Sequence, residues 1–191
     1  MYTRREFGAL TAMAVGYLAV PGSLRAQIDS TVGGVQIGVQ TYSFRSLRRA
    51  RGGDQSEAIV QAMMRCRLGD CELWSPSIEP AQAVRGSSRE VQRRARDELR
   101  LWRIETPLSH FESIRDRFMS SGIGIYGFNY SFNDSFSDAE IDRGFEIARA
   151  LGAEIITASA TFSAMKRVIP FAERHEMVVA VHNHSNVSDP N

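Results

Sequence analysis

Lysine is almost missing from this sequence of 191 residues, in which Lys166 stands alone among 23 basic residues. The 22 acidic residues leave a net charge of +1, which excludes a whole-molecule field that would draw in nucleic acid or an anionic membrane. Arginines gather over residues 85–103, but acidic residues interrupt them and Trp102 is the only aromatic residue there. We therefore expect no nucleic-acid partner.

Several catalytic motifs are also absent. Gly122 and Gly124 precede an apolar run and not a helix, which excludes a phosphate-binding loop of the dinucleotide or P-loop kind. No serine stands in the context of a nucleophile elbow. The only cysteines, Cys66 and Cys71, flank a turn at Gly69 and have no histidine pair nearby, so we expect two reduced, partly buried thiols and no zinc motif.

A long apolar run is missing as well. Arg4 and Arg5 precede an apolar stretch that ends near Pro21, which is too short for a stable span of ~20 residues. This arrangement is typical of a twin-arginine signal. We expect residues 1–26 to direct export to the bacterial periplasm and residues 27–191 to form the domain. The alternative is an ordinary amphipathic helix.

From residue 35 onward, apolar runs alternate with amphipathic segments. We expect strands at 35–40, 71–74, 123–128, 153–160 and 177–181, with helices between them and an extra polar helix over 87–103. Apolar strands that are each followed by a helix indicate an α/β fold with a parallel sheet. Five strands fit a small doubly wound sheet, or a partial (β/α)8 TIM barrel whose last strands are missing, since a whole barrel takes about 250 residues.

Local signals mark the ends of these helices. Ser87 and Glu90 have the spacing of a capping box, and so do Ser137 and Glu140. Pro170 lies within the last expected helix, which predicts either a kink or a late start.

In both architectures, binding sites form where the carboxyl ends of parallel strands meet the following loops. The polar and aromatic residues at those ends are Tyr42, Glu72, Trp74, Asn129, Ser159, His182 and His184. Glu72 is the most unusual, because burying an unpaired carboxylate in a short apolar strand would cost several kcal/mol. We expect it to have a partner, a bound cation or a role in proton transfer. A structural ion pair with an arginine is the alternative.

The two histidines alternate along the last strand, so both imidazoles can face one side of it. His182 and His184 suit a divalent metal, although a complete site needs three or four ligands. Structural or hydrogen-bonding histidines are the alternative. We expect this chain alone to bind divalent metals weakly or not at all.

Seven segments occur together in one order: 38–44 (GVQTYSF), 72–75 (ELWS), 127–132 (GFNYSF), 140–145 (EIDRGF), 150–152 (ALG), 157–159 (TAS) and 181–185 (VHNHS). This set resembles the exported branch of the sugar phosphate isomerase/epimerase family, the xylose isomerase-like TIM barrels. The resemblance covers residues 35–191. Relatives of this kind move a proton between adjacent carbons of a sugar or cyclitol, with Mn²⁺, Mg²⁺ or Zn²⁺ at the carboxyl ends of the strands.

The resemblance also implies a role for each site residue. Glu72 would act in catalysis, and His182 and His184 would contact the metal. The residues that would bind the substrate are Tyr42, Trp74, Asn129 and Ser159. His182 stands where many relatives carry a glutamate ligand. An imidazole is also a competent metal ligand, but it cannot serve as the bridging carboxylate base. The other ligands of the family come from later strands.

Two further functions stay open beside an isomerase or epimerase. One is a lyase or hydrolase acting on oxidised sugars on the same barrel, and the other is a truncated, inactive fragment. An in-frame continuation of the gene with Asp, His and Glu at strand ends would favour the enzyme, and a stop codon would favour the fragment. An apurinic-site endonuclease of the same superfamily fits less well, because the early strands carry no histidine.

Overall fold

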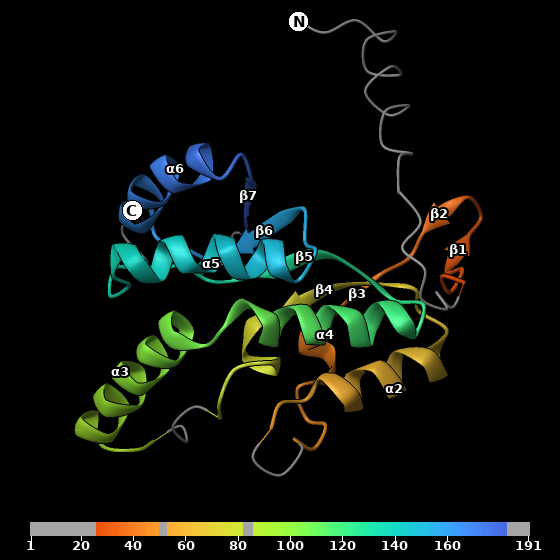
Figure 1. Cartoon of the computed structure of the whole chain (residues 1–191), viewed down its shortest axis with the longest axis horizontal. Helices are drawn as coiled ribbons and strands as arrows, with labels where there is room; N and C mark the ends of the chain where they lie inside the picture. Colours follow the sequence, from red (N-terminus) through yellow and green to blue (C-terminus); the bar gives the residue numbers. More distant parts are fainter. Residues whose placement is uncertain (1–25, 50–52, 82–85, 183–191) are drawn as a thin grey trace, which may run out of the picture.

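The computed structural model describes residues 26–49, 53–81 and 86–182 (Figure 1). The predicted signal over residues 1–26 therefore lies, apart from Ala26, outside the described residues. Within those ranges, no helix combines the length and the apolar character that crossing a membrane requires.

Five parallel strands form the central sheet, and their order in the sheet is their order in the chain. They are β3 (Val39–Gln40), β4 (Asp70–Trp74), β5 (Gly124–Asn129), β6 (Ile155–Ala158) and β7 (Val178–Val181). A doubly wound sheet reverses its order at a switch point, whereas a barrel adds each strand beside the previous one. The fold is thus α/β and is part of a (β/α)8 barrel, which confirms the sequence prediction.

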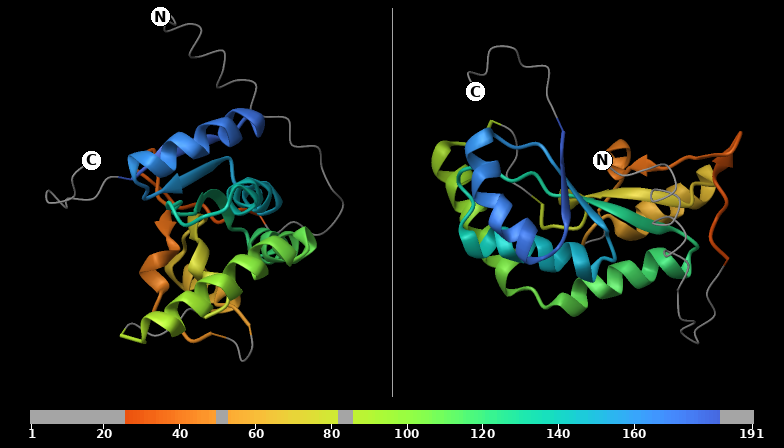
Figure 2. Two further views of the ribbon diagram at one scale, coloured as in Figure 1. Left: turned by 90° about the vertical axis from the view of Figure 1, so that its left-hand side faces the viewer. Right: turned by 90° about the horizontal axis from the view of Figure 1, so that it is seen from above.

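Helices follow the strands and cover one face of the sheet. They are α2 (Ser56–Cys66), α4 (Leu108–Ser120), α5 (Asp138–Ala150) and α6 (Phe162–Arg174). The additional helix α3 (Arg89–Glu105) comes between β4 and α4 and projects from the body of the molecule (Figures 1 and 2). Strand residues that face the helices, such as Leu73, Phe128 and Ile156, are fully buried. The opposite face, which lies inside a barrel, is left open to polar side chains.

One close approach fixes α5 against the segment that follows β5. Tyr130 is fully buried, and a Cβ atom at Gly144 would lie 2.4 Å from Cε1 of the tyrosine ring. Only glycine fits at this position of α5 without displacing Tyr130. The packing of the ring holds the loop between β5 and α5 over the carboxyl end of the sheet.

The expected strand at 35–40 is wrong in its first half. Val35–Gln36 forms β2, which pairs antiparallel with β1 (Thr31–Val32) in a separate hairpin. Gly33 and Gly34 make the turn with φ of 58° and 81°, a left-handed conformation that glycine adopts at little cost. Two consecutive glycines between β-branched residues are a hairpin signal, and it was available in the sequence.

The local signals are confirmed only in part. Ser137 caps α5 through a hydrogen bond of 3.2 Å from the backbone N–H of Glu140, but Ser88 and not Ser87 caps α3. Pro170 lies within a helix that already begins at Phe162, so its start is not late.

Both cysteines are free, as predicted, but neither is partly buried. Cys66 is exposed and Cys71 is buried. Burial raises the pKa of the Cys71 thiol far above its usual value, so this thiol stays protonated and is a poor nucleophile.

Candidate active site

Glu72 lies on the open face of β4. Its neighbours Cys71 and Leu73 are buried against the helices, whereas Glu72 itself is half-buried. Its Oε1 accepts a hydrogen bond of 2.7 Å from Nε2 of Gln40 and a second one from the hydroxyl of Thr157. Within the described residues no arginine forms an ion pair with Glu72. Hydrogen bonds therefore hold this carboxylate in place of the structural ion pair that the sequence also allowed.

These bonds belong to a row that crosses four neighbouring strands. Gln40 of β3 lies beside Glu72 of β4, and Asn129 of β5 lies beside Thr157 of β6. The Thr157 hydroxyl donates to Glu72 and accepts a hydrogen bond of 3.0 Å from Nδ2 of Asn129. Since one hydroxyl has one proton to donate, this arrangement fixes its direction. The row presents one carboxylate and two amides to the interior of the barrel.

A bulge on β5 brings a phenol close to the carboxylate. Cys71 lies beside Ile125 and Glu72 lies beside Gly127, so Tyr126 is an extra residue between two paired positions. Burial, followed by the negative charge of Glu72, raises the pKa of Tyr126. Tyr126 therefore stays protonated at neutral pH. Bulges of this kind often redirect a side chain next to an active site.

Tyr42 and Trp74 form an aromatic pair at the carboxyl end of the strands. Their ring centroids lie 4.9 Å apart with the planes at 88°. The backbone N–H of Trp74 donates a hydrogen bond of 2.8 Å to the buried hydroxyl of Thr41, which ties the 3-10 helix η1 (Thr41–Phe44) to the end of β4. Such rings offer an apolar surface beside polar groups, which suits the C–H face of a sugar.

A hollow of about 250 Å³ lies beside Trp74. Trp74 and Asn129 line it from the strand ends, and α3 contributes Arg96, Arg100 and Arg103. The remaining lining residues come from α3, α5 and the loops that follow β4 and β5: Ser75, Pro76, Leu99, Ser131, Asn133, Ser135, Phe136 and Glu140. The extra helix thus forms a wall of the candidate site.

The other predicted site residues lie farther along the same edge. The backbone N–H of Ser159 donates a hydrogen bond of 3.3 Å to the hydroxyl of Ser131, which lines the hollow. His182 follows β7 directly, its side chain is exposed, and its backbone N–H donates to the carbonyl oxygen of Ala158 at 2.8 Å. His184 lies outside the described residues. The structure thus gathers Tyr42, Glu72, Trp74 and Asn129 into one region, with Ser159 beside it.

A divalent metal finds no complete set of ligands in the described part of the chain. Across residues 26–49, 53–81 and 86–182, no three His, Cys, Asp or Glu side chains gather into a possible metal site. His182 supplies one imidazole at most, whereas a stable site needs three or four ligands. The described residues therefore do not fit the metal by themselves.

Sequence reasoning missed a buried ionic cluster that supports the wall made by α3. Arg103 donates to Glu79 at 2.8 Å and to Glu140 at 2.7 Å, and all three side chains are less than 10% exposed. Its guanidinium also lies 4.8 Å from the ring centroid of Tyr130. The spacing of Ser137 and Glu140 suggested only a helix cap, and no local pattern indicates that Glu140 reaches Arg103.

No family model and no curated protein matches the chain. Solved structures do match. A protein from Parabacteroides distasonis ATCC 8503 is 19% identical with a TM-score of 0.53, and the match covers 78% of this chain and 53% of that one.

Two further structures are similar at lower TM-scores. A probable 3-DHS dehydratase of Bacillus anthracis involved in petrobactin synthesis is 13% identical, with a TM-score of 0.46 and coverage of 78% of this chain and 53% of that one. A sugar phosphate isomerase/epimerase of Parabacteroides distasonis is 12% identical, with a TM-score of 0.47 and coverage of 85% and 60%. The chain thus spans little more than half the length of these structures. The likeness to the 19% identical protein, whose TM-score is 0.53, shows a shared fold, the partial (β/α)8 barrel.

Proposed function

We propose that this chain forms the sugar-binding part of a xylose isomerase-like barrel that isomerises or epimerises a sugar or cyclitol. The observation that carries the proposal is the position of Glu72 on the inner face, where Gln40 and Thr157 hold it near the carboxyl ends of the strands. The ordered motifs of the sequence support the same family. The activity of a complete barrel would also involve strands that follow those described.

Glu72 is the candidate acid and base. Both of its described hydrogen bonds go to Oε1, and no described residue donates to Oε2. We assign Oε2 the task of taking a proton from a carbon beside a carbonyl group and returning it to the adjacent carbon. Fixing the other oxygen orients the carboxylate before the substrate arrives, and a positioned acid–base group of this kind contributes ~10²–10⁴-fold to the rate.

The neighbouring groups suit a polyhydroxylated substrate. The amide of Gln40 offers its second N–H and its oxygen to hydroxyl groups. The amide of Asn129 offers its oxygen, because its nitrogen donates to the hydroxyl and to the carbonyl oxygen of Thr157. Trp74 and Tyr42 would pack against the C–H face of the ring. These contacts would set the carbon that loses its proton against Glu72.

Sugar binding tests the proposal directly, because the fluorescence of Trp74 responds to a ligand in the hollow that this residue lines. The second described tryptophan, Trp102, does not line the hollow and packs against His110 and Phe111. We expect D-xylose or D-glucose to change the tryptophan emission of the chain in a saturable way. Asn129→Leu should weaken the apparent affinity by roughly tenfold, because a buried polar contact is lost.

The matched control is Gln61→Leu, which replaces an exposed amide of α2 that donates to Glu57 of the same helix and leaves the row across the strands intact. Its affinity for the sugar should stay within about twofold of the unchanged chain. Emission that does not respond to any aldose or ketose, or a response that Asn129→Leu leaves intact, would contradict the proposed site.

Divalent metals should bind this chain weakly. We propose that His182 and His184 contribute to a metal site of the complete family member, in which the metal would polarise carbonyl and hydroxyl oxygens. Titration calorimetry of the chain with Mn²⁺, Mg²⁺ and Zn²⁺ should give no tight stoichiometric binding, since two imidazoles are fewer than the three or four ligands of a stable site. A tight stoichiometric site that His182→Ala removes would refute this expectation.

A further inference from the structure

Five arginines of α3 lie on one side of the helix. Arg89, Arg93, Arg96, Arg100 and Arg103 follow one another at intervals of four and three residues. At 3.6 residues per turn these positions fall within a band about 80° wide. Like charges at these spacings repel one another and weaken a helix. Water and counter-ions compensate the exposed arginines of this row, whereas a buried arginine needs an anionic partner.

The row leads from the surface to the candidate active site. Arg89 and Arg93 line a shallow surface hollow near the start of α3, and Arg96 lines both this hollow and the one beside Trp74. Arg100 and Arg103 continue the row within the second hollow. Arg96 and Arg100 thus line the same hollow as Trp74 and Asn129.

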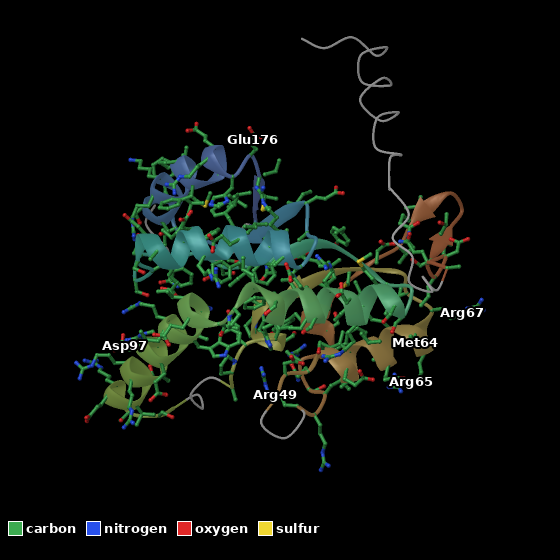
Figure 3. All side chains as sticks on the ribbon, in the orientation of Figure 1. Arg49, Met64, Arg65, Arg67, Asp97 and Glu176 are labelled. Atoms are coloured by element: carbon green, nitrogen blue, oxygen red, sulfur yellow. The ribbon has the colours of Figure 1, made fainter. Side chains whose placement is uncertain are left out.

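Carboxylates pair with Arg103 and Arg100 at the inner end of the row and leave Arg96 without an ion pair in the described part of the chain. Arg103 is satisfied by Glu79 and Glu140 at 2.8 and 2.7 Å. Arg100 forms ion pairs with Asp97 at 3.2 Å and with Glu140 at 3.5 Å, and it donates to the carbonyl oxygen of Ser135 at 3.3 Å. Its Nε is buried without a hydrogen bond in the described part of the chain. In Figure 3 the labelled Asp97 lies on the part of α3 that projects from the body.

Arg96 has no anionic partner among the described residues. Three arginines and one glutamate are the charged residues that line the hollow, and the buried Glu79 behind it offsets Arg103. Asp97 and Glu140 offset Arg100, so Arg96 is the arginine of the hollow that no described carboxylate offsets. Serine and asparagine side chains of the loop after β5 stand opposite and add hydrogen-bonding groups: Ser131, Asn133 and Ser135.

We infer that Arg96 and Arg100 bind an anionic group of the substrate, a carboxylate or a phosphate, in the hollow beside Trp74 and Asn129. The inference rests on the proposed sugar-binding function and narrows it to acidic sugars. Guanidinium groups bind both anions through paired N–H donors. The anion would occupy the wall made by α3, while the ring of the sugar lies toward Glu72.

Titration calorimetry of the chain with D-glucuronate, D-glucose 6-phosphate and D-glucose tests the inference. At least one of the two anionic sugars should bind roughly tenfold more tightly than glucose, since each charge-assisted hydrogen bond favours the anion. Arg96→Gln should remove most of this difference in affinity without weakening the binding of glucose. The preferred anionic sugar identifies the group, carboxylate or phosphate.

The control is Arg94→Gln, which changes an arginine of the same helix on another side, where it pairs with Glu98 in solvent. Its affinity for the anionic sugar should equal that of the unchanged chain. Equal binding of glucose and of both anionic sugars, unaffected by Arg96→Gln, would overturn the anion site and leave the sugar function standing. Binding of inorganic phosphate that depends on Arg96, in a chain that binds no sugar, would instead support the anion site and refute the sugar function.

Discussion

Glu72→Gln is expected to lower the rate of proton transfer by ~10²–10⁴-fold while sugar binding stays within a few fold of the unchanged chain. Glutamine has nearly the same shape as glutamate, and its amide oxygen can still accept from Gln40 and Thr157. What the variant loses is an oxygen that takes up a proton. Binding and catalysis therefore separate at this position.

Exchange in D₂O measures that single step. A sugar whose proton is taken and returned acquires deuterium at the carbon next to its carbonyl group, and NMR follows the incorporation even when the reaction goes no further. The unchanged chain should catalyse exchange and Glu72→Gln should not. Exchange at an equal rate in both would show that another group is the base, and no exchange in either would favour the inactive fragment.

Asp70→Asn is the matched control for this experiment. Asp70 lies on the same strand and the same side as Glu72 but at the amino end, where Gln27 and Gln36 donate to its carboxylate. Residues at that end of a barrel strand act in stability, and residues at the carboxyl end act in catalysis. The exchange rate of Asp70→Asn should therefore match that of the unchanged chain. A loss as large as that of Glu72→Gln would show a general effect of charge in the barrel.

The architecture follows from features that sequence reasoning handles well. Apolar runs that alternate with amphipathic segments predict parallel strands and covering helices, and strand ends pick out Glu72, Trp74 and Asn129. The partners of Glu72 were not found in this way. Gln40 and Thr157 look like ordinary polar residues of short strands, and only the register between strands brings them to the carboxylate.

The ionic cluster of Arg103, Glu79 and Glu140 could not be predicted from the sequence for a related reason. Arg103 is 24 residues from Glu79 and 37 from Glu140. The arginine sits in a polar helix whose composition predicts exposure, and that prediction holds for most of α3 but not for its inner end. Nothing local distinguishes Arg103 from the exposed Arg94, because the difference is made by the approach of α5 and of the chain after β4.

Arg103→Met is expected to lower the free energy of unfolding by about 3–5 kcal/mol, because removing one partner of a buried ion pair leaves the other charge uncompensated. The variant would leave Glu79 buried without a cation and Glu140 with Arg100 alone at 3.5 Å, although each carboxylate side chain is less than 5% exposed. Methionine keeps most of the apolar stem that packs beside Tyr130 and Phe136, so the loss would come mainly from the unpaired charges. Urea unfolding followed by far-UV circular dichroism measures it.

Two further variants separate unpaired charge from lost packing. Arg94→Met removes an exposed pair with Glu98, whose partners are 82% and 65% exposed, and should cost no more than about 1 kcal/mol. Adding Glu79→Gln and Glu140→Gln to Arg103→Met should restore part of the stability, because neutral amides cost less to bury than unpaired carboxylates. If the triple variant is no more stable than the single one, the loss comes from packing.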